Sequence, residues 1–195
     1  MAIMVGTGIS TASYPDRLLT LADWDLMEED ELHHVECVEG VLEVSPNQAA
    51  LHQHIMYGIT VILHAQLPTD VIPIQDFDTL LEDGPLTIRR PDVVVLPRSI
   101  VAGNPKLAQV ADVQLAVEII SPSGRRRDRV TKLNEYAEFG IGEYWIVDPG
   151  DPTTLTVHQH DGAGGYRLVG DFSGRVSIEC LGVQLEFDLD EISAI

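Results

Sequence analysis

The sequence predicts a fold of α/β or α+β class, in which a central sheet is flanked by helices. Apolar strand-like segments alternate with segments of helical periodicity. With 195 residues, 45% of them hydrophobic and 22% charged, the chain resembles an ordinary globular protein that can bury a core without a metal or disulfide. We expect residues 1–17 to form a loose leader and residues 18–195 to form one domain.

The first predicted elements are a short helix, a hairpin and a longer helix. Thr20 is a suitable N-cap for a helix that runs to Met27. Apolar residues then alternate from Val35 to Val44 around Glu39-Gly40, which predicts a hairpin that turns there. Helical spacing of isoleucines and leucines predicts a helix over Ala49–Leu67, and the proline that follows ends it.

The rest of the chain is predicted to supply most of the sheet and one more helix. The strands are expected at Val71–Phe77, Leu86–Leu96, Gln114–Ile120 and Tyr144–Val147. A short amphipathic helix is expected over Asp128–Phe139, because Gly140 is a typical residue for a helix end. From Leu155 onward, glycine-containing turns separate short strand-like segments.

The net charge of −19 is distributed unevenly along the chain. At face value it speaks against a nucleic-acid partner, because phosphate binding rests on Lys and Arg. However, nine of the 12 basic residues lie between Arg89 and Lys132. This segment is either a local anion site or, at Arg125–Arg127, a solvated loop paired with nearby acids.

The composition also predicts a cellular location. The sequence contains no run of about 18 apolar residues and no basic leader followed by an apolar segment, so we expect neither a membrane span nor a secretory signal. Two cysteines are too few for a disulfide scaffold or a four-ligand zinc site. The prediction is a cytoplasmic protein.

Two acidic residues stand out because they lie in apolar segments. Glu118 interrupts the apolar run from Leu115 to Ile120, where an unpaired carboxylate would cost several kcal/mol, so it needs a cation or an Arg partner. Asp92 opens an apolar run after Pro91, a position where Asp is also a common turn residue. On neighbouring strands, about 4.8 Å apart, the two carboxylates would repel each other without a cation between them. Mg²⁺ prefers such oxygen ligands, and this arrangement suits phosphodiester hydrolysis.

The helix expected after residue 127 supplies a third component. At 100° per residue, one face carries Asp128, Lys132, Glu135 and Tyr136, and the opposite face carries Val130, Leu133 and Ala137. We expect the apolar face to pack against the sheet. Lys132 is then either a surface partner of Asp128, worth about 0.3–0.5 kcal/mol, or a cation that reaches the strand ends and stabilises charge on a phosphoryl group.

These segments resemble the Uma-two family of restriction-endonuclease-like proteins, in the PD-(D/E)XK nuclease superfamily. The residues that carry the resemblance are Pro91-Asp92, Val117–Ser123, Arg127-Asp128, Lys132, Tyr136, Gly140 and Glu143–Pro149. The resemblance extends from about Leu18 to Ile192 and includes the Val35–Gly40 hairpin. It implies a restriction-endonuclease-like α/β core with a central mixed sheet, metal-dependent cleavage of DNA, and a homodimer.

The resemblance also implies roles for individual residues. By position, Asp92 and Glu118 would ligate Mg²⁺ or Mn²⁺, and Glu36 would be a further acidic residue of the catalytic site. The lysine that the superfamily places two residues after the glutamate is replaced by Ile120, and Lys132 is its expected substitute.

The residues expected to meet the substrate are Arg127, Arg129, Tyr136, His52 and Ser121. Packing is the alternative role for Tyr136, and His52 is assigned mainly on the resemblance. The leading prediction is therefore a Mg²⁺- or Mn²⁺-dependent endonuclease that acts on DNA, with Lys132 orienting or activating water. Two alternatives stay open: an inactive nuclease fold that serves as a binding module, and an acidic protein-interaction protein that mimics the charge of DNA. The net charge of −19 favours these alternatives, since DNA enzymes usually display a wider basic footprint.

Overall fold

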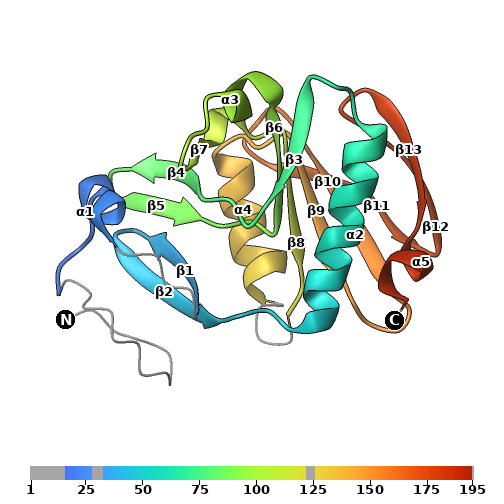
Figure 1. Ribbon diagram of the computed structural model, residues 1–195, viewed down its shortest axis with the longest axis horizontal. Helices are drawn as coiled ribbons and strands as arrows, with labels where there is room; N and C mark the ends of the chain where they lie inside the picture. The colour runs from blue at the N-terminus through green and yellow to red at the C-terminus, as the bar shows by residue number, and fades with distance from the viewer. Residues whose placement is uncertain (1–15, 28–32, 122–125, 195) are drawn as a thin grey trace.

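The computed structural model describes residues 16–27, 33–121 and 126–194 (Figure 1). Most of the expected leader therefore lies outside the described residues, as do residues 122–125. The elements, in chain order, are α1 (Leu21–Leu26), β1 (His33–Val38), β2 (Val41–Pro46), α2 (Ala50–Gln66), β3 (Val71–Gln75), β4 (Thr79–Asp83), β5 (Leu86–Arg89), β6 (Val93–Pro97), α3 (Arg98–Ala102), β7 (Ala108–Gln109), a 3₁₀ turn (Val110–Asp112), β8 (Leu115–Ile119), a π-helical turn (Arg127–Thr131), α4 (Lys132–Glu138), β9 (Glu143–Asp148), β10 (Thr154–His160), β11 (Tyr166–Ser173), β12 (Arg175–Cys180), β13 (Val183–Asp188) and α5 (Leu189–Ser193). Within the described ranges, no helix has both the length and the apolar character needed to cross a membrane.

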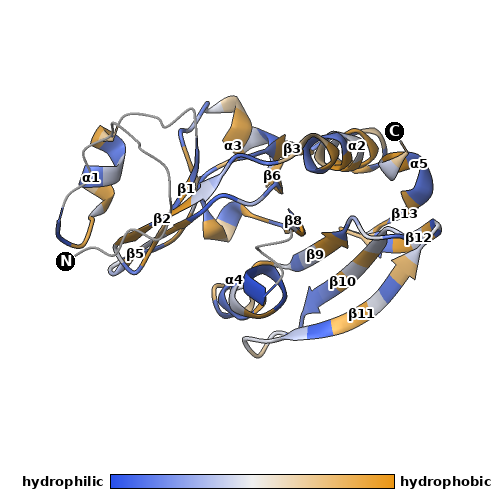
Figure 2. Ribbon diagram, turned by 90° about the horizontal axis from the view of Figure 1, so that it is seen from below, coloured by the Kyte–Doolittle hydropathy of each residue, from blue (hydrophilic) through white to orange (hydrophobic). Residues whose placement is uncertain are grey.

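The larger sheet has six strands in the order β11-β10-β9-β8-β6-β3. β8 and β9 are parallel, whereas the other neighbours are antiparallel, so the predicted central mixed sheet is confirmed. One face packs against α2 and the β12–β13 hairpin, and the other packs against α4. Figure 2 shows α2 and α4 on opposite sides of this sheet.

The two faces of the sheet follow from strand periodicity, because successive side chains point to opposite faces. Val93 on β6 and Val117 on β8 belong to the core beneath α2. Val94 and Ala116 belong to the core beneath α4. Glu118 has the same parity as Ala116, so its side chain enters the α4 side of the sheet.

The smaller sheet has five strands in the order β2-β1-β5-β4-β7 and contains the predicted hairpin. Glu39 and Gly40 occupy the turn with φ values of 49° and 78°, as a two-residue type I′ turn requires. A Cβ at residue 40 would lie 2.9 Å from the Cβ of Leu18, so glycine also allows the close approach of the chain before α1. The predicted hairpin is therefore confirmed.

The segment Leu86–Leu96 does not form the single strand that we expected. β5 pairs within the smaller sheet and β6 pairs within the larger one. The chain passes from one sheet to the other through residues 90–92, where a proline cannot donate to a ladder. Asp92 consequently lies at the junction of the two sheets.

The helix expected over residues 128–139 buries both the apolar face that we expected, through Ala137 and partly Leu133, and the polar face that we did not expect to be buried. It begins as a π-helical turn, in which the Lys132 N–H donates to the carbonyl of the residue five positions earlier. Asp128, Lys132 and Tyr136 are buried, whereas Val130 is 50% exposed. The polar face is buried as well because carboxylates from two distant strands, on Glu36 and Glu118, compensate the buried lysine.

Candidate active site

Four of the predicted site residues meet where both sheets approach α4. Glu36 comes from β1, Asp92 precedes β6, Glu118 lies on β8, and Lys132 begins α4. All four are buried. The antiparallel register pairs Val93 with Val117, so the next pair along the ladder places Asp92 opposite Glu118.

The Lys132 ammonium lies between two of these carboxylates. Its Nζ donates to Glu118 Oε1 at 2.7 Å and lies 3.0 Å from Glu36 Oε1. The hydroxyl of Tyr136 donates to the same Oε1 of Glu118 at 2.9 Å. Burial alone would lower the pKa of Lys132, but the charges of Glu118, Glu36 and Asp128 raise it above its usual range. The side chain is therefore a firmly protonated cation and hydrogen-bond donor.

Glu36 is the best compensated carboxylate of the cluster. In addition to Lys132, it accepts a hydrogen bond from Arg89 Nη1 at 3.1 Å and one from the backbone N–H of Arg90 at 3.0 Å. Burial would raise its pKa, but Lys132, His34 and Arg89 hold the pKa of Glu36 well below its usual range. Glu36 is therefore ionised and holds Lys132 in place.

A buried guanidinium connects the hairpin to the helix. Arg89 is 1% exposed and also donates to Glu43 at 2.9 Å and to both oxygens of Glu135 at 2.8 Å. This network fixes β1 and β2 against α4, and thereby sets the position of Glu36 relative to Lys132. Planar bidentate pairs of this kind are the strong class of ionic hydrogen bond.

Glu118 is poorly compensated by comparison. Both of the hydrogen bonds that it accepts from described residues reach Oε1, and Oε2 accepts none from them. Burial raises the pKa of Glu118 well above its usual range; Lys132 opposes this, while Asp92, Asp128 and Glu36 add to it. Apart from Lys132, the charged groups that act on Glu118 are negative, so these surroundings favour a further cation.

Asp92 is oriented by the start of α2 and by the backbone of β8. Its Oδ2 accepts a hydrogen bond from the Ile119 N–H at 2.5 Å, and its Oδ1 accepts one from Gln48 Nε2 at 2.6 Å. His52 Nε2 lies 3.0 Å from the same Oδ1, although the ring is not aligned for a good hydrogen bond. The structure thus places His52 beside the site, as expected.

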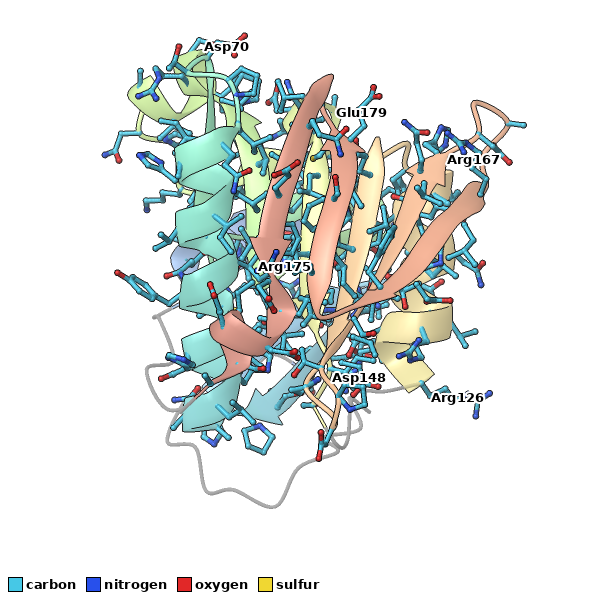
Figure 3. All side chains as sticks on the ribbon, turned by 90° about the vertical axis from the view of Figure 1, so that its right-hand side faces the viewer. Asp70, Arg126, Asp148, Arg167, Arg175 and Glu179 are labelled. Carbon is cyan, nitrogen blue, oxygen red and sulfur yellow. The ribbon has the colours of Figure 1, made fainter. Side chains whose placement is uncertain are left out.

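The residues predicted to meet the substrate are spread around this cluster. Arg127 donates to Ser45 Oγ at 3.4 Å and lies 3.9 Å from Glu36, while Arg129 donates to Asp148 Oδ2 at 3.1 Å. Ser121 is half-buried just after β8. Figure 3 shows Arg126 and Asp148 at the same end of the molecule, opposite Arg167. Substrate contact stays a prediction for all of these residues, and for Tyr136 and His52.

The central basic segment is largely neutralised within the fold. The arginines that pair with carboxylates are Arg89, Arg90, Arg127 and Arg129. These four residues therefore fit the interpretation in which the basic segment pairs with nearby acids. Arg125 lies outside the described residues. Besides the buried Glu36, the four other acidic partners of these arginines are partly exposed; they are Glu43, Asp78, Glu135 and Asp148.

The carboxylates of Asp92 and Glu118 fit a hard divalent cation. Glu118 keeps one oxygen without a donor, and like charges crowd it. Mg²⁺ typically takes one or two protein carboxylates, with water and phosphate oxygens completing its octahedron. Over the described ranges, no three His, Cys, Asp or Glu side chains are grouped closely enough to hold an ion by themselves.

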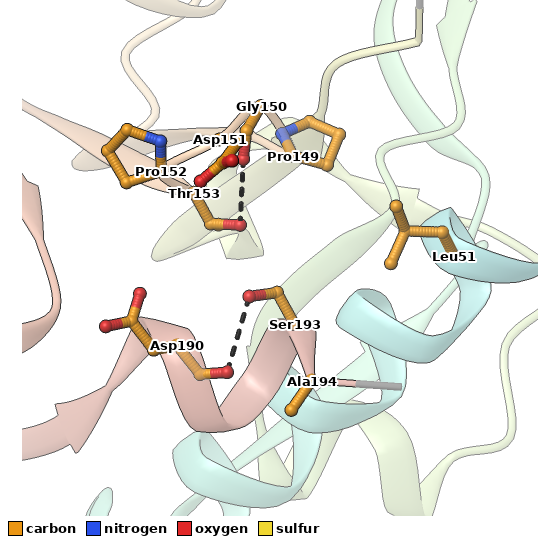
Figure 4. Close-up of a pocket in the computed structure, with 9 residues that line it drawn as sticks. All are labelled: Leu51, Pro149, Gly150, Asp151, Pro152, Thr153, Asp190, Ser193 and Ala194. Atoms are coloured by element: carbon orange, nitrogen blue, oxygen red, sulfur yellow. Dashed lines mark hydrogen bonds between the residues drawn. The ribbon is translucent and has the colours of Figure 1, made fainter.

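A separate surface pocket of about 270 Å³ lies between α5, the start of α2 and the turn after β9 (Figure 4). Its lining residues are Leu51, Pro149, Gly150, Asp151, Pro152, Thr153, Asp190, Ser193 and Ala194. None of the predicted site residues lines it. Its two charged side chains are acidic, so this pocket does not suit a phosphate.

Sequence reasoning did not assign Arg89, Gln48 or Asp128 to the site. The available signal for Asp128 was its place one turn before Lys132 on the same helix face. Arg89 lies three residues before Asp92, but its partners come from two distant elements. Gln48 carried no signal, because it lies in a short irregular segment before α2.

The comparisons with known proteins agree with this fold. A family model named Uma2 and described as "Putative restriction endonuclease" matches residues 18–190. A crystal structure described as a "putative nuclease" from Anabaena variabilis is similar, with a TM-score of 0.70 and 16% sequence identity; the match covers 90% of this chain and 98% of the other. At that identity the likeness shows the fold alone. No curated protein matches this chain.

Proposed function

The chain belongs to the Uma2 family, and on this premise we propose that it is a divalent-metal-dependent endonuclease that hydrolyses DNA phosphodiester bonds. The observation that carries the proposal is the meeting of three charged groups from distant parts of the chain. Asp92 stands opposite Glu118 at the junction of the two sheets, and the Lys132 ammonium lies 2.7 Å from Glu118.

Asp92 and Glu118 would hold the Mg²⁺ or Mn²⁺ ion. When bound, such an ion polarises a phosphoryl oxygen and lowers the pKa of a water molecule. The Gln48 side chain, in the segment before α2, and the Ile119 N–H orient Asp92 for this task. Glu118 offers its donor-free Oε2.

Lys132 would stabilise the negative charge that develops on the phosphoryl group, because a buried ammonium acts in surroundings that exclude water. Glu36 and Arg89 position it. Arg127 and Arg129 would contact DNA phosphates in place of their present acidic partners, Glu36 and Asp148. A homodimer and a cytoplasmic location belong to the same proposal; light scattering of the purified protein tests the first.

The experiment is a plasmid-nicking assay with Mg²⁺ or Mn²⁺. It compares the wild type with Asp92→Ala, Glu118→Ala and Lys132→Ala, and includes the exposed-site variant Glu138→Gln as a control. The wild type and the control should nick the plasmid, and the three site variants should not. Equal activity in all the preparations would leave the site without support.

The second candidate is a binding module on the nuclease fold, or an acidic protein that interacts with other proteins by mimicking DNA. The net charge of −19 and the internal pairing of Arg127 and Arg129 favour it. Calorimetry with Mn²⁺ separates the two candidates. If the protein is an endonuclease, it should bind Mn²⁺ and Asp92→Ala should abolish that binding. If it is a DNA mimic, no Mn²⁺ binding that depends on Asp92 should be observed.

A further inference from the structure

Asp128 is a buried acidic residue whose carboxylate has no partner among the described residues. It lies in the π-helical turn before Lys132 and is 5% exposed. Its backbone carbonyl accepts a hydrogen bond from the Tyr144 hydroxyl at 2.9 Å, which fixes the backbone of this turn. No described residue donates to its side chain. Within the described ranges, the fully buried polar side-chain atoms without a partner belong to His52 and His158, so the oxygens of Asp128 keep contact with solvent and can meet a water molecule.

The other carboxylates of the cluster differ from Asp128 in this respect. Glu36 accepts from Arg89 and the Arg90 N–H, and Asp92 accepts from Gln48 and the Ile119 N–H. Glu118 accepts from Lys132 and Tyr136. Asp128 alone among the four therefore keeps both oxygens available to a water molecule.

The surroundings of Asp128 place it within the same electrostatic cluster. Burial raises the pKa of its carboxyl above the usual range; the positive charges of Lys132 and Arg127 oppose this, and the negative charges of Asp92 and Glu36 add to it. A carboxyl with a raised pKa is a better proton acceptor than one with an ordinary pKa.

We propose that Asp128 is the proton acceptor for the water molecule that attacks the phosphodiester. This inference rests on the proposed function. Lys132 does not take this role, because its Nζ is held between Glu118, at 2.7 Å, and Glu36, at 3.0 Å. Asp128 is not a ligand of the ion in this proposal; Asp92 and Glu118 keep that role.

An O–H bond of the water breaks, its proton passes to a carboxylate oxygen of Asp128, and the electron pair of that bond forms the new P–O bond. The bond between phosphorus and the leaving oxygen breaks with its electron pair on that oxygen, which takes a proton from solvent. Asp128 then releases its proton to solvent.

Asp128→Asn tests the proposal, with Glu138→Gln as the exposed control on the same helix. Removing a general base costs about 100-fold or more in cleavage, so we expect that loss in Asp128→Asn and none in the control. The Mn²⁺ dissociation constant, measured by calorimetry, should stay within about threefold of the wild type, because Asp128 is not a ligand of the ion in this proposal. The melting temperature should not fall, since the variant replaces a buried charge that has no partner.

A second variant tests the acid–base role by chemical rescue. Formate should restore part of the cleavage to Asp128→Ala, since it supplies a carboxylate in the vacated space, and should restore none to Lys132→Ala. A merely structural role of Asp128 would give no such rescue.

Each other outcome overturns the inference. If Asp128→Asn cleaves as the wild type does, or loses Mn²⁺ binding, or if formate rescues nothing, Asp128 is not the acceptor, although the proposed function stands. If the wild type itself binds Mn²⁺ but cleaves no DNA, the proposed function and this role are both wrong.

Discussion

Two buried glutamates on the neighbouring parallel strands β8 and β9 have opposite surroundings. The register pairs Leu115 with Glu143, so Glu143 lies at the beginning of β9, whereas Glu118 lies near the end of β8. Each oxygen of Glu143 accepts one neutral donor, the Leu181 N–H at 3.1 Å and the Trp145 Nε1–H at 3.3 Å. Glu118 accepts two hydrogen bonds from the described part of the chain, and both reach one oxygen.

The difference shows that burial alone does not mark a functional carboxylate. Glu143 connects the β12–β13 hairpin to the sheet through balanced hydrogen bonds, and this is a structural task. Glu118 lacks donors on one side and shares its surroundings with Asp92, Asp128 and Glu36. A deficit of donors together with crowding by like charges is the pattern expected of a group that awaits a ligand.

The largest effect is expected at Lys132, whose ammonium lies between Glu118 and Glu36. Lys132→Met should lower the free energy of unfolding by about 3–5 kcal/mol, because it leaves buried carboxylates without their partner. Urea denaturation measures this change. The exposed control Lys106→Met should stay within about 0.5 kcal/mol of the wild type. A loss below about 1 kcal/mol for Lys132→Met would show that the cluster is not held by this ion pair.

The two glutamates themselves should respond in opposite ways to the same substitution. Glu143→Gln should cost about 1–3 kcal/mol of stability, because its amide group must face one of the two N–H donors, and should leave cleavage unchanged. Glu118→Gln should abolish Mn²⁺ binding at little cost in stability, since an amide oxygen still accepts from Lys132. Denaturation and Mn²⁺ calorimetry on both variants make the comparison; the reverse assignment of effects would contradict it.

The acid limb of the stability curve should depend on Glu36. Its pKa is lower in the folded state than in the unfolded chain, where it is about 4.3. The stability that this difference supplies is present above about pH 4.3 and is lost as the pH falls through the folded-state pKa, by about 1.4 kcal/mol for each unit of lowering. Glu36→Gln should therefore flatten the decline in stability below about pH 4.3 in urea titrations. An unchanged decline would assign acid sensitivity to other carboxylates.

The elements with strong local signals could be predicted from the sequence. Periodicity located α2, the β1–β2 hairpin and β8, and the acidic interruption at Glu118 marked its strand as unusual. The opposition of Asp92 and Glu118 followed from the expectation that their strands are neighbours. These features depend on residues close together in the chain, or on a single strand pairing.

The features that were missed depend on distant partners. The polar face of α4 is buried because Glu36 and Glu118 receive the Lys132 ammonium, and helical periodicity contains no information about those partners. The division of residues 86–96 between two sheets was likewise hidden, since a proline predicts a local interruption and not a change of sheet. Arg89 could not be assigned, because the residues that it joins, Glu43 and Glu135, are far apart in the sequence.

The smallest effect is expected at the rim of the cluster, where Arg129 pairs with Asp148. The side chain of Arg129 is 36% exposed, so Arg129→Ala should change the free energy of unfolding by less than about 1 kcal/mol. If Arg129 contacts a phosphate, the slope of log affinity for DNA against log salt should fall by about 1 in this variant. Fluorescence anisotropy at several salt concentrations, with Ca²⁺ in place of Mg²⁺, measures the slope. A lower slope with unchanged stability would show that Arg129 contacts substrate, whereas the buried Lys132 stabilises the fold. An unchanged slope would show that the role of Arg129 is limited to its ion pair with Asp148.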